Sequence, residues 1–259
     1  MHSSDLFSLS GKVALITGGA GLYGRQIVAA LAEAGAVTYM ASRGVDALES
    51  LAAEHRERGH DVHALALDQG DEASVLAVRD RILAEQGQID VLINNAVSRP
   101  MRSWHDPIET FAESMRVNAT GVFAVTRAIG DVMAARGSGS ILNIASIQGH
   151  VGPDAELYKD LPFTGFIPDY FFHKGGMINL TRFIASYYGP QGVRCNSLSP
   201  GGFYSGQDPV FVERYAQRTM LGRMAGDSDL QGAVVFFASD ASRYITGTDL
   251  PIDGGYTAK

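Results

Sequence analysis

The chain has 259 residues, of which 46% are hydrophobic and 19% charged, so it can bury a full core and fits one large α/β domain better than two small ones. Its net charge of −7 and its pI of about 5.4 argue against nucleic acid or an anionic membrane as the main partner, because both demand a basic patch. The single cysteine, Cys195, excludes an intrachain disulfide and a multi-cysteine metal site, and with no signal-peptide pattern or membrane-length apolar stretch we expect a cytoplasmic protein without a metal.

A buried strand, a glycine-rich turn and a helix follow one another directly between residues 12 and 33. Residues 13–16 are a short apolar run, and residues 27–34 carry apolar side chains at helical spacing. Between them, three glycines fit the G-x-G-x-x-G pattern in the strand–turn–helix context that it requires: Gly19, Gly21 and Gly24. The first N–H groups of such a helix bind a dinucleotide pyrophosphate, and a Cβ at the closest approach would collide with it. The sequence therefore predicts a dinucleotide site, with an ordinary tight turn as the alternative.

The second strand is predicted over residues 36–40, and Ser42 and Arg43 follow it closely. In a dinucleotide fold, an acidic residue about twenty positions past the glycines binds the ribose 2′-OH, whereas an arginine there accommodates a 2′-phosphate. The acidic residue is missing here, and Ser42 and Arg43 supply a hydroxyl and a guanidinium that suit a phosphate. We therefore predict that NADP(H) is preferred and that NAD(H) is possible. The alternative for Arg43 is a solvated arginine at a helix start.

Strands and helices alternate strictly through the first half of the chain. A third strand over residues 62–67 ends at Asp68 and Gln69, and a fourth over residues 89–93 leads into Asn94-Asn95-Ala96. Such alternation predicts a Rossmann-like, doubly wound parallel sheet with helices on both faces. Ligands bind where the carboxyl ends of the strands meet a switch in strand order, so these polar residues are expected at the ligand-facing edge.

A loop over a pocket is predicted at residues 99–106, and a long helical pattern follows it. Arg99 is a candidate contact for an acidic substrate, although solvated loop arginines are commoner. The helical pattern runs from about residue 109 to residue 135 and contains Asn118. A polar side chain inside an apolar helix needs hydrogen-bond partners.

Two elements of the second half carry a serine, a tyrosine and a lysine. The fifth strand, over residues 141–145, ends at Ser146, and Tyr170 and Lys174 lie four positions apart on one face of an amphipathic helix. A tyrosine is a poor base near neutrality because its ordinary pKa is about 10, but a nearby ammonium stabilises the phenolate. Lys174 can supply that ammonium, although such a pair is by itself common on surface helices.

Together these segments resemble the short-chain dehydrogenase/reductase family over nearly the whole chain. The matching residues, in the family's order, are Thr17 to Gly24, Asp68, Asn94-Asn95-Ala96, Asn118 with Gly121, Ser146, Tyr170 with Lys174, Pro200-Gly201 and Asp253-Gly254-Gly255. The resemblance implies a sheet of about seven strands in a single domain over residues 1–259. It also implies a homodimeric or homotetrameric oxidoreductase that moves a hydride between a nicotinamide cofactor and a secondary alcohol or ketone.

The resemblance also implies roles for individual residues. Tyr170 would be the acid/base, Ser146 would orient the reacting oxygen, and Lys174 would also hold the nicotinamide ribose. Asn118 would support a water relay to Lys174. The substrate contacts would be Ser146, Gln148, Tyr170 and Arg99. The cofactor contacts would be Gly18, Gly19, Gly21, Leu22, Tyr23, Gly24, Ser42, Arg43, Asp68, Gln69, Asn95, Ala96, Val97, Tyr170, Lys174, Pro200, Gly201, Phe203 and Ser205.

One departure from the family pattern leaves an alternative open. Leu22 stands where the simple pattern has glycine, and the spacing Gly18, Gly21, Gly24 resembles that of nucleotide-sugar epimerases. An epimerase-like enzyme is therefore one alternative, although such epimerases are longer and carry a substrate domain. A non-catalytic cofactor-sensing protein on the same fold is the other. The complete set of four predicted catalytic residues favours the oxidoreductase, since a sensor has little need of all four.

Residues 150–169 form an insertion between Ser146 and Tyr170, beyond what simple family members carry. Prolines mixed with charged and hydroxyl side chains predict an irregular polar loop rather than a helix or strand. Because both ends are anchored at the reaction centre, we expect a lid over the substrate pocket; the alternative is a surface insertion that packs on a neighbouring subunit. Its donors and acceptors, with Gln148 and Arg99, favour a sugar, sugar acid or other polyhydroxy substrate. The resemblance to gluconate 5-dehydrogenase-like and other sugar-processing members of the family favours the same substrates.

Overall fold

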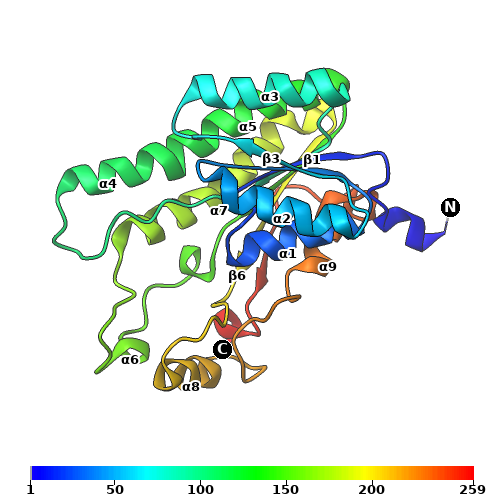
Figure 1. The fold of residues 1–259 in the computed structure, drawn as a ribbon. Coiled ribbons are helices and arrows are strands. Elements are labelled where there is room, and N and C mark those ends of the chain that lie inside the picture. The colour runs from blue at the N-terminus through cyan, green and yellow to red at the C-terminus, as the bar shows by residue number, and fades with distance from the viewer. Residues whose placement is uncertain (1) are drawn as a thin grey trace.

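Seven parallel strands form one sheet in the computed structural model, which describes residues 2–259 (Figure 1). The strands are β1 (Val13–Thr17), β2 (Val37–Ser42), β3 (Val62–Ala66), β4 (Val91–Asn94), β5 (Gly139–Ile144), β6 (Val193–Pro200) and β7 (Asp249–Ile252). Their order across the sheet is β3-β2-β1-β4-β5-β6-β7, and every neighbouring pair is parallel. The order switches direction between β1 and β4, so the predicted doubly wound fold is confirmed.

Helices cover both faces of this sheet. The α-helices are α1 (Leu22–Glu33), α2 (Val45–Glu57), α3 (Glu72–Gln86), α4 (Ile108–Met115), α5 (Val122–Arg136), α6 (Ala155–Tyr158), α7 (Pro168–Tyr188), α8 (Pro209–Arg218) and α9 (Gln231–Ala238). The short η elements are η1 (Ser3–Phe7), η2 (Arg116–Gly121), η3 (Ile147–Gly149), η4 (Gly189–Gln191), η5 (Asp240–Ser242) and η6 (Tyr256–Ala258). One face carries α1, α2 and α9, and the other carries α3, α5 and α7 (Figure 1). Within residues 2–259, none of the helices has the length and apolar character needed to cross a bilayer.

The strand β1 lies between the two layers of helices and is buried along its whole length. Ala14 and Ile16 pack toward α1, α2 and α9, whereas Val13 and Leu15 pack toward α3, α5 and α7. A strand covered on both faces is apolar at successive positions rather than at alternate ones, which is why residues 13–16 form an unbroken apolar run. The glycine-rich turn therefore projects from a strand that is buried along its whole length.

Most predicted strand ends differ from the structure by one or two residues, and two differences concern predicted site residues. β2 runs on to Ser42, so Ser42 belongs to the strand and Arg43 follows it. The single helix expected over residues 109–135 is two α-helices, α4 and α5, joined by the π-helical segment η2. Such segments often occur at functional sites, and hydrophobic periodicity cannot reveal one because the helical pattern continues through it.

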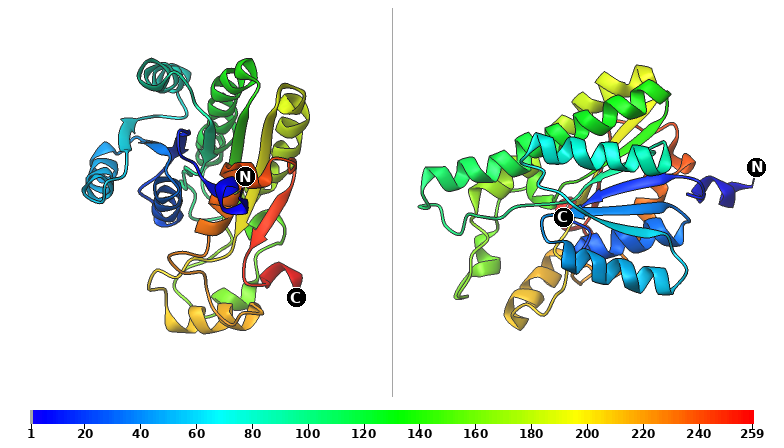
Figure 2. Two further views of the ribbon diagram at one scale, coloured as in Figure 1. Left: turned by 90° about the vertical axis from the view of Figure 1, so that its right-hand side faces the viewer. Right: turned by 45° about the horizontal axis from the view of Figure 1, so that its top comes forward.

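The expectation of a wholly irregular polar loop at residues 150–169 is wrong in part. The segment contains the one-turn helix α6, and α7 begins within it at Pro168. Leu157 is buried in an apolar cluster with Phe211 and Tyr215 of α8. The views in Figure 2 show α6 and α8 projecting from the body of the sheet, and the two helices are in contact. The apolar partners of α6 lie far later in the chain, so local composition does not show them.

Candidate active site

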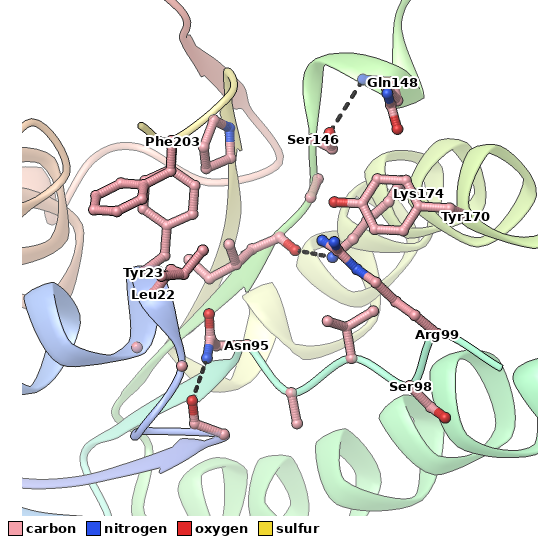
Figure 3. Close-up of a pocket in the computed structure, with 18 of the residues that line it drawn as sticks. Leu22, Tyr23, Asn95, Ser98, Arg99, Ser146, Gln148, Tyr170, Lys174 and Phe203 are labelled. Carbon is pink, nitrogen blue, oxygen red and sulfur yellow. Dashed lines mark hydrogen bonds between the residues drawn. The ribbon is translucent and has the colours of Figure 1, made fainter. Parts of the chain in front are cut away.

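A cavity of about 700 Å³ at the carboxyl ends of the strands collects most of the predicted site residues (Figure 3). The predicted residues that line it are Gly18, Gly21, Leu22, Tyr23, Gly24, Ser42, Arg43, Asp68, Gln69, Asn95, Ala96, Val97, Arg99, Ser146, Gln148, Tyr170, Lys174, Pro200, Gly201 and Phe203. Three predicted residues lie outside this lining, namely Gly19, Asn118 and Ser205. The cavity joins the glycine turn after β1 to the residues that follow β5 and to the first turns of α7.

The turn between β1 and α1 has a backbone geometry that requires glycine. Gly18 has a φ of +74°, and a Cβ there would lie 2.8 Å from the Cα of Ala96. A Cβ on Gly24 would collide with the carbonyl oxygen of Gly18. Gly19 faces the sheet, where a Cβ would lie 2.9 Å from the side chain of Met40. Gly19 therefore serves the packing of the turn, which explains why it does not line the cavity.

The N-terminus of α1 is suited to a diphosphate. Gly21, the N-cap residue, makes no side-chain hydrogen bond to the first N–H groups of the helix, and the first turn carries no acidic residue. The first N–H groups of a helix lack intrahelical acceptors, and the helix dipole attracts negative charge to them. The residues present therefore fit a dinucleotide, whose pyrophosphate would be held by the N–H groups of Leu22, Tyr23 and Gly24.

Asn95 has a structural task that the sequence did not indicate. Its Nδ2 donates to the carbonyl oxygens of Thr17 at 3.1 Å and Gly18 at 2.8 Å. The Thr17 hydroxyl accepts from the backbone N–H of Asn95 at 3.1 Å and of Ala96 at 3.0 Å. These bonds tie the end of β4 to the end of β1, so Asn95 shapes the glycine turn in addition to lining the cavity.

Ser42, Arg43 and Asp68 line the cavity on the side of β2 and β3. Ser42 Oγ donates to the carbonyl oxygen of Gly44 at 3.1 Å, and Asp68 Oδ1 accepts from the N–H of Gly70 at 2.9 Å. Arg43 makes no ion pair with any carboxylate within residues 2–259. An unpaired guanidinium at this strand end can bind a phosphate group through charge-assisted hydrogen bonds.

Ser146, Tyr170 and Lys174 meet at the other side of the cavity (Figure 3). Ser146 follows β5, and its Oγ accepts from the N–H of Gln148 at 3.2 Å, so its own hydrogen is free to be donated. Lys174 is only 3% exposed, and its Nζ donates to the carbonyl oxygen of Ile144 at 2.5 Å. The same Nζ lies 5.7 Å from the centroid of the Tyr170 ring. The three side chains therefore lie at the same end of one cavity.

Positive charge gathers at this end of the cavity. The guanidinium carbon of Arg99 lies 4.7 Å from the centroid of the Tyr170 ring. Burial, together with the charge of Arg99, lowers the pKa of Lys174 to about 7. Burial, Lys174 and Arg99 lower the pKa of His173 to about 3, so His173 is neutral near pH 7. Arg99 and protonated Lys174 therefore favour negative charge on an oxygen bound near them.

Asn118 lies in η2, outside the cavity lining, and is 4% exposed. Its Oδ1 accepts from the N–H of Ser98 at 2.8 Å, and its Nδ2 donates to the carbonyl oxygen of Ser98 at 2.7 Å and to Ser114 Oγ at 3.0 Å. These are the partners that a buried amide needs. Because η2 also contacts α7, Asn118 is held beside the helix that carries Tyr170 and Lys174.

The sequence predicted that the insertion lies over the pocket, but it did not assign the individual lining residues of the insertion, and it did not indicate any contribution from α8 or from Met224 after it. The cavity is also lined by Tyr158, Thr164, Gly165, Ile167, Asp169, Phe211, Tyr215 and Met224. The rings of Tyr158 and Phe211 lie 5.5 Å apart between centroids, which joins the insertion to α8. The one local signal was the i, i+4 spacing of Phe211 and Tyr215, which indicates an apolar helix face but not the surface that it covers.

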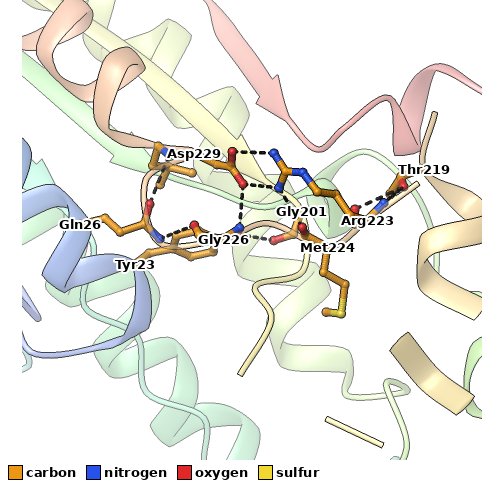
Figure 4. A network of polar contacts seen from close by, with 9 residues as sticks. Tyr23, Gln26, Gly201, Thr219, Arg223, Met224, Gly226 and Asp229 are labelled. Carbon is orange, nitrogen blue, oxygen red and sulfur yellow. Dashed lines mark hydrogen bonds and ion pairs between the residues drawn. The ribbon is translucent and has the colours of Figure 1, made fainter. Parts of the chain in front are cut away.

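A polar network supports the wall that faces Tyr170 across the cavity (Figures 3 and 4). Tyr23 Oη donates to the carbonyl oxygen of Gly201 at 2.8 Å. Gln26 Nε2 donates to the carbonyl oxygen of Gly226 at 3.0 Å, and the N–H of Gly226 donates to Asp229 at 2.7 Å. These contacts attach α1 to the chain segments before and after α8.

Ser205 does not reach the cavity. It is exposed, and its backbone N–H donates to Gln207 Oε1 at 2.8 Å. The neighbouring Phe203 does line the cavity, with its ring centroid 5.3 Å from that of Tyr23. No cluster of three or more His, Cys, Asp or Glu side chains that could hold a metal ion occurs within residues 2–259.

The doubly wound sheet, the glycine cradle and the Ser–Tyr–Lys cluster in one cavity define a class, the nicotinamide-dependent oxidoreductases. The family model described as enoyl-(acyl carrier protein) reductase matches residues 21–257. The chain belongs to the short-chain dehydrogenase/reductase family.

Three similar proteins narrow the class further. The D-threitol dehydrogenase of Mycolicibacterium smegmatis is 34% identical over 98% of this chain and 95% of its own. The gluconate 5-dehydrogenase of Burkholderia cenocepacia, solved with NADP and tartrate, is 33% identical with a TM-score of 0.89 over 100% of both chains. An NAD+-bound xylitol dehydrogenase is 29% identical with a TM-score of 0.86, over 95% of this chain and 99% of its own.

All three of these relatives are dehydrogenases. The chain is an NAD(P)-dependent oxidoreductase that transfers a hydride between a nicotinamide cofactor and its substrate. The epimerase-like and sensor alternatives find no support among them.

Proposed function

We propose that this enzyme interconverts a secondary hydroxyl group and a ketone on a sugar, sugar acid or other polyhydroxy compound, with NADP(H) as the preferred cofactor. The observation that carries the proposal is the meeting of Ser146, Tyr170 and Lys174 in a cavity that continues to the glycine turn of α1. Gln148 and Arg99 line the same cavity and supply polar contacts for further hydroxyl or carboxylate groups. Threitol, gluconate and xylitol, which give the three relatives their names, are polyhydroxy compounds.

In the oxidation direction, Ser146 Oγ donates a hydrogen bond to the substrate oxygen, and Tyr170 Oη removes the hydroxyl proton. A bound nicotinamide ring supplies the acceptor for the hydride that leaves the same carbon. Protonated Lys174 stabilises negative charge on the tyrosine oxygen. In the reduction direction, Tyr170 returns the proton to the substrate oxygen as that oxygen becomes negative. Asn118 supports the water relay through which Lys174 exchanges protons with solvent.

Lys174 also has N–H donors that are available to bind the nicotinamide ribose. An ammonium carries three N–H donors, and the carbonyl oxygen of Ile144 occupies one of them. The remaining two would hold the ribose hydroxyl groups and a relay water. Lys174 is therefore proposed to act in cofactor binding and in proton transfer together.

A substrate panel tests the proposed activity. Polyols, sugar acids and keto sugars are offered with NADP(H) and with NAD(H), and turnover is followed at the nicotinamide absorbance. We expect turnover of at least one polyhydroxy compound, and none in a Ser146→Ala, Tyr170→Phe double variant. Turnover confined to simple alcohols and ketones without neighbouring hydroxyl groups would show that the substrate class is wrong.

The preference for NADP(H) is proposed to depend on Arg43. Charge-assisted hydrogen bonds contribute roughly 1.5–3 kcal/mol, so Arg43→Ala should weaken NADPH binding by about 10- to 100-fold and leave NADH binding nearly unchanged. Fluorescence titration of both reduced cofactors measures this. Arg58→Ala is the control, because Arg58 is exposed at the end of α2 and does not line the cavity. Tighter binding of NADH than of NADPH by the unaltered protein would contradict the proposal.

Residues 150–169 are proposed to form a lid on a single domain that spans residues 1–259. The base of the segment is held by His150 Nε2, which lies 2.7 Å from Asp249 Oδ2. Its middle is joined to α8 by Arg218, whose Nε lies 2.7 Å from Asp154 Oδ2. Several of its residues line the cavity near Gln148. These contacts support a cover over the substrate rather than a free surface loop.

We further propose a cytoplasmic homo-oligomer, a dimer or tetramer, whose partners include neither nucleic acid nor a membrane. Aromatic side chains of α5 and α7 support the oligomer, since Phe123, Phe172, Phe183 and Tyr187 are all exposed. The two helices lie side by side, joined by a hydrogen bond of 2.7 Å from Tyr188 Oη to Asp131. Exposed apolar clusters of this kind mark contact surfaces. The net charge of −7 supports the exclusion of polyanionic partners.

A further inference from the structure

One peptide group of the cavity wall, between Gly201 and Gly202, is held from two sides by tyrosine hydroxyls. Tyr23 Oη donates to the carbonyl oxygen of Gly201 at 2.8 Å (Figure 4), and Tyr215 Oη accepts from the N–H of Gly202 at 2.5 Å. Tyr23 lies in the first turn of α1, and Tyr215 lies in α8. The two side chains therefore connect the helix at the glycine turn to the helix that contacts the insertion, through a single peptide group.

The two hydroxyls are the only hydrogen-bond partners of this peptide group within residues 2–259. The nearby backbone bonds hold the groups on either side of it. The N–H of Gly201 donates to the carbonyl oxygen of Ile252 at 3.0 Å, and the carbonyl oxygen of Gly202 accepts from the N–H of Ala225 at 2.9 Å. Glycine offers little steric resistance to backbone rotation, and the peptide group lies between two glycines. Its position therefore depends on the tyrosines.

The close approach of Tyr215 explains why both positions are glycine. A Cβ on Gly201 would lie 3.0 Å from Tyr215 Oη, and a Cβ on Gly202 would lie 3.0 Å from carbon atoms of the Tyr215 ring. Neither glycine has a positive φ, so the backbone conformation does not itself require glycine. Burial raises the pKa of both Tyr23 and Tyr215, so both hydroxyls stay protonated near pH 7.

The peptide group belongs to the wall that Tyr170 faces across the cavity (Figure 3). Phe203 lies in the same wall, with its ring centroid 5.3 Å from that of Tyr23. The cavity joins the N-terminus of α1 to Ser146 and Tyr170, so a cofactor whose pyrophosphate lies at α1 must extend along this wall to bring its nicotinamide ring to them. A misplacement of about 1 Å between reacting groups can lower a rate roughly 10²-fold. A displaced wall would therefore slow hydride transfer.

We propose that Tyr23 and Tyr215 are positioning residues whose hydroxyls hold the Gly201–Gly202 peptide group, and with it the nicotinamide side of the cavity, at the distance from Tyr170 that hydride transfer requires. The inference rests on the proposed function only in placing the reacting carbon beside Tyr170. It is independent of which hydroxyl compound is oxidised.

Two variants delete the hydroxyl oxygens and keep the aromatic rings. Tyr23→Phe and Tyr215→Phe should each lower kcat about tenfold or more. The Kd for NADPH should stay nearly unchanged, because the N–H groups of α1 and the side chain of Arg43 are unaltered. The double variant should be about as slow as the slower single variant, since both hydroxyls act on one peptide group. Tyr39→Phe is the control, because the Tyr39 hydroxyl donates to Glu85 outside the cavity.

Single-turnover consumption of NADPH separates hydride transfer from product release, and the loss should appear there. An unchanged kcat in both single variants would overturn the inference. A raised Kd for NADPH with an unchanged single-turnover rate would indicate a direct cofactor contact and would also overturn it.

Hydrogen–deuterium exchange gives a readout that needs neither turnover nor ligand. The N–H of Gly202 loses its partner in Tyr215→Phe, so residues 200–204 of the ligand-free protein should exchange faster in that variant, less so in Tyr23→Phe, and at the wild-type rate in Tyr39→Phe. Unchanged exchange of residues 200–204 in both test variants would overturn the inference. Faster exchange along the whole of α8 would indicate a general loss of packing and would overturn it as well.

The same measurements distinguish failure of this inference from failure of the proposed function. Kinetics are recorded with the best substrate that the panel identifies. Faster exchange of residues 200–204 together with slower hydride transfer, in a protein that turns over only simple alcohols and ketones, would remove the proposed substrate class and leave the positioning role standing.

Discussion

Local spacing places Tyr170 and Lys174 on one face of α7, whereas burial sets the contacts and the pKa of Lys174. Residues four apart on a helix share a face, which the sequence alone reveals. The contact of Lys174 Nζ with the carbonyl oxygen of Ile144 and the exclusion of water around it depend on the packing of α7 against β5. That packing brings the pKa of Lys174 to about 7, so the lysine titrates where a surface lysine would stay charged.

Tyr170→Phe tests the proposed acid/base directly, because it deletes only the phenolic oxygen. Loss of a general acid/base typically lowers the rate about 10²- to 10⁴-fold, so kcat should fall by that factor while the Kd for NADPH stays almost the same. Tyr39→Phe is the control, since the Tyr39 hydroxyl donates to Glu85 outside the cavity. Near-wild-type turnover by Tyr170→Phe on the best substrate would show that the assignment is wrong.

Lys174 also predicts how stability changes with pH. Its pKa is 10.5 ordinarily and about 7 in the folded protein, so between these values the unfolded chain binds more protons at this position. Raising the pH through this range therefore stabilises the folded state. In Lys174→Met this contribution disappears. The free energy of unfolding of the wild type, measured in urea, should rise relative to that of Lys174→Met from about pH 7 to about pH 9.

A difference between the two proteins that stays constant across that range would contradict the lowered pKa. Lys174→Met should also lose both turnover and cofactor affinity, because the lysine is proposed to serve both. Retained cofactor affinity in this variant would show that Lys174 does not hold the nicotinamide ribose.

At the scale of elements, η2 and α6 matter most for the site. η2 is a π-helical segment between α4 and α5, and it places Asn118 where it bonds Ser98 and Ser114. α6 lies within the insertion and packs on α8 through Leu157. Both elements depend on partners that are distant in the chain, so neither the periodicity nor the composition of the local sequence indicated them.

The lid hypothesis predicts separate effects on substrate and cofactor. Replacing residues 155–166 by a short Gly-Ser linker should raise the KM for substrate severalfold and leave the Kd for NADPH and the oligomeric mass unchanged, because the segment is proposed to cover only the substrate end. Arg218→Ala, which breaks the contact with Asp154, should raise the KM by a smaller factor. Arg81→Ala serves as the control, because it removes an ion pair with Glu85 that lies outside the cavity. Unchanged kinetics with an altered mass would favour the subunit-contact alternative.

At the scale of the whole molecule, one face carries the site and another carries exposed aromatic side chains. The cavity opens at the carboxyl ends of the strands, whereas Phe183 and Tyr187 lie on the outer side of α7 and are 62% and 61% exposed. Their rings stack with centroids 6.1 Å apart. The proposed oligomer would bury this surface without closing the cavity.

Phe183→Glu tests that surface. A charge in an apolar contact is unfavourable, so the variant should show a smaller mass by light scattering at micromolar concentration than the wild type. Arg58→Glu, on the opposite side of the sheet at the end of α2, should leave the mass unchanged. An unaltered mass in Phe183→Glu would place the contact elsewhere or show that the protein is a monomer.

By itself, the sequence determined the features that depend on neighbours along the chain. The alternation of strands and helices, the glycine turn after β1 and the spacing of Tyr170 and Lys174 are local patterns, set by backbone geometry and by the period of each element. They were sufficient for the fold class, which the seven-stranded parallel sheet confirms. Most of the predicted cofactor residues also line one cavity, because the carboxyl ends of parallel strands share an edge.

Only the tertiary structure decided the features that depend on contacts across the chain. The bond from Ser114 to Asp169 joins residues 55 positions apart, and α6 packs on α8 through an equally remote contact. The pKa of Lys174 depends on how completely water is excluded around it. The spacing of residues along the chain does not predict that exclusion. Hydrogen bonding and desolvation are set by which surfaces meet, and that is fixed only when the helices dock on the sheet.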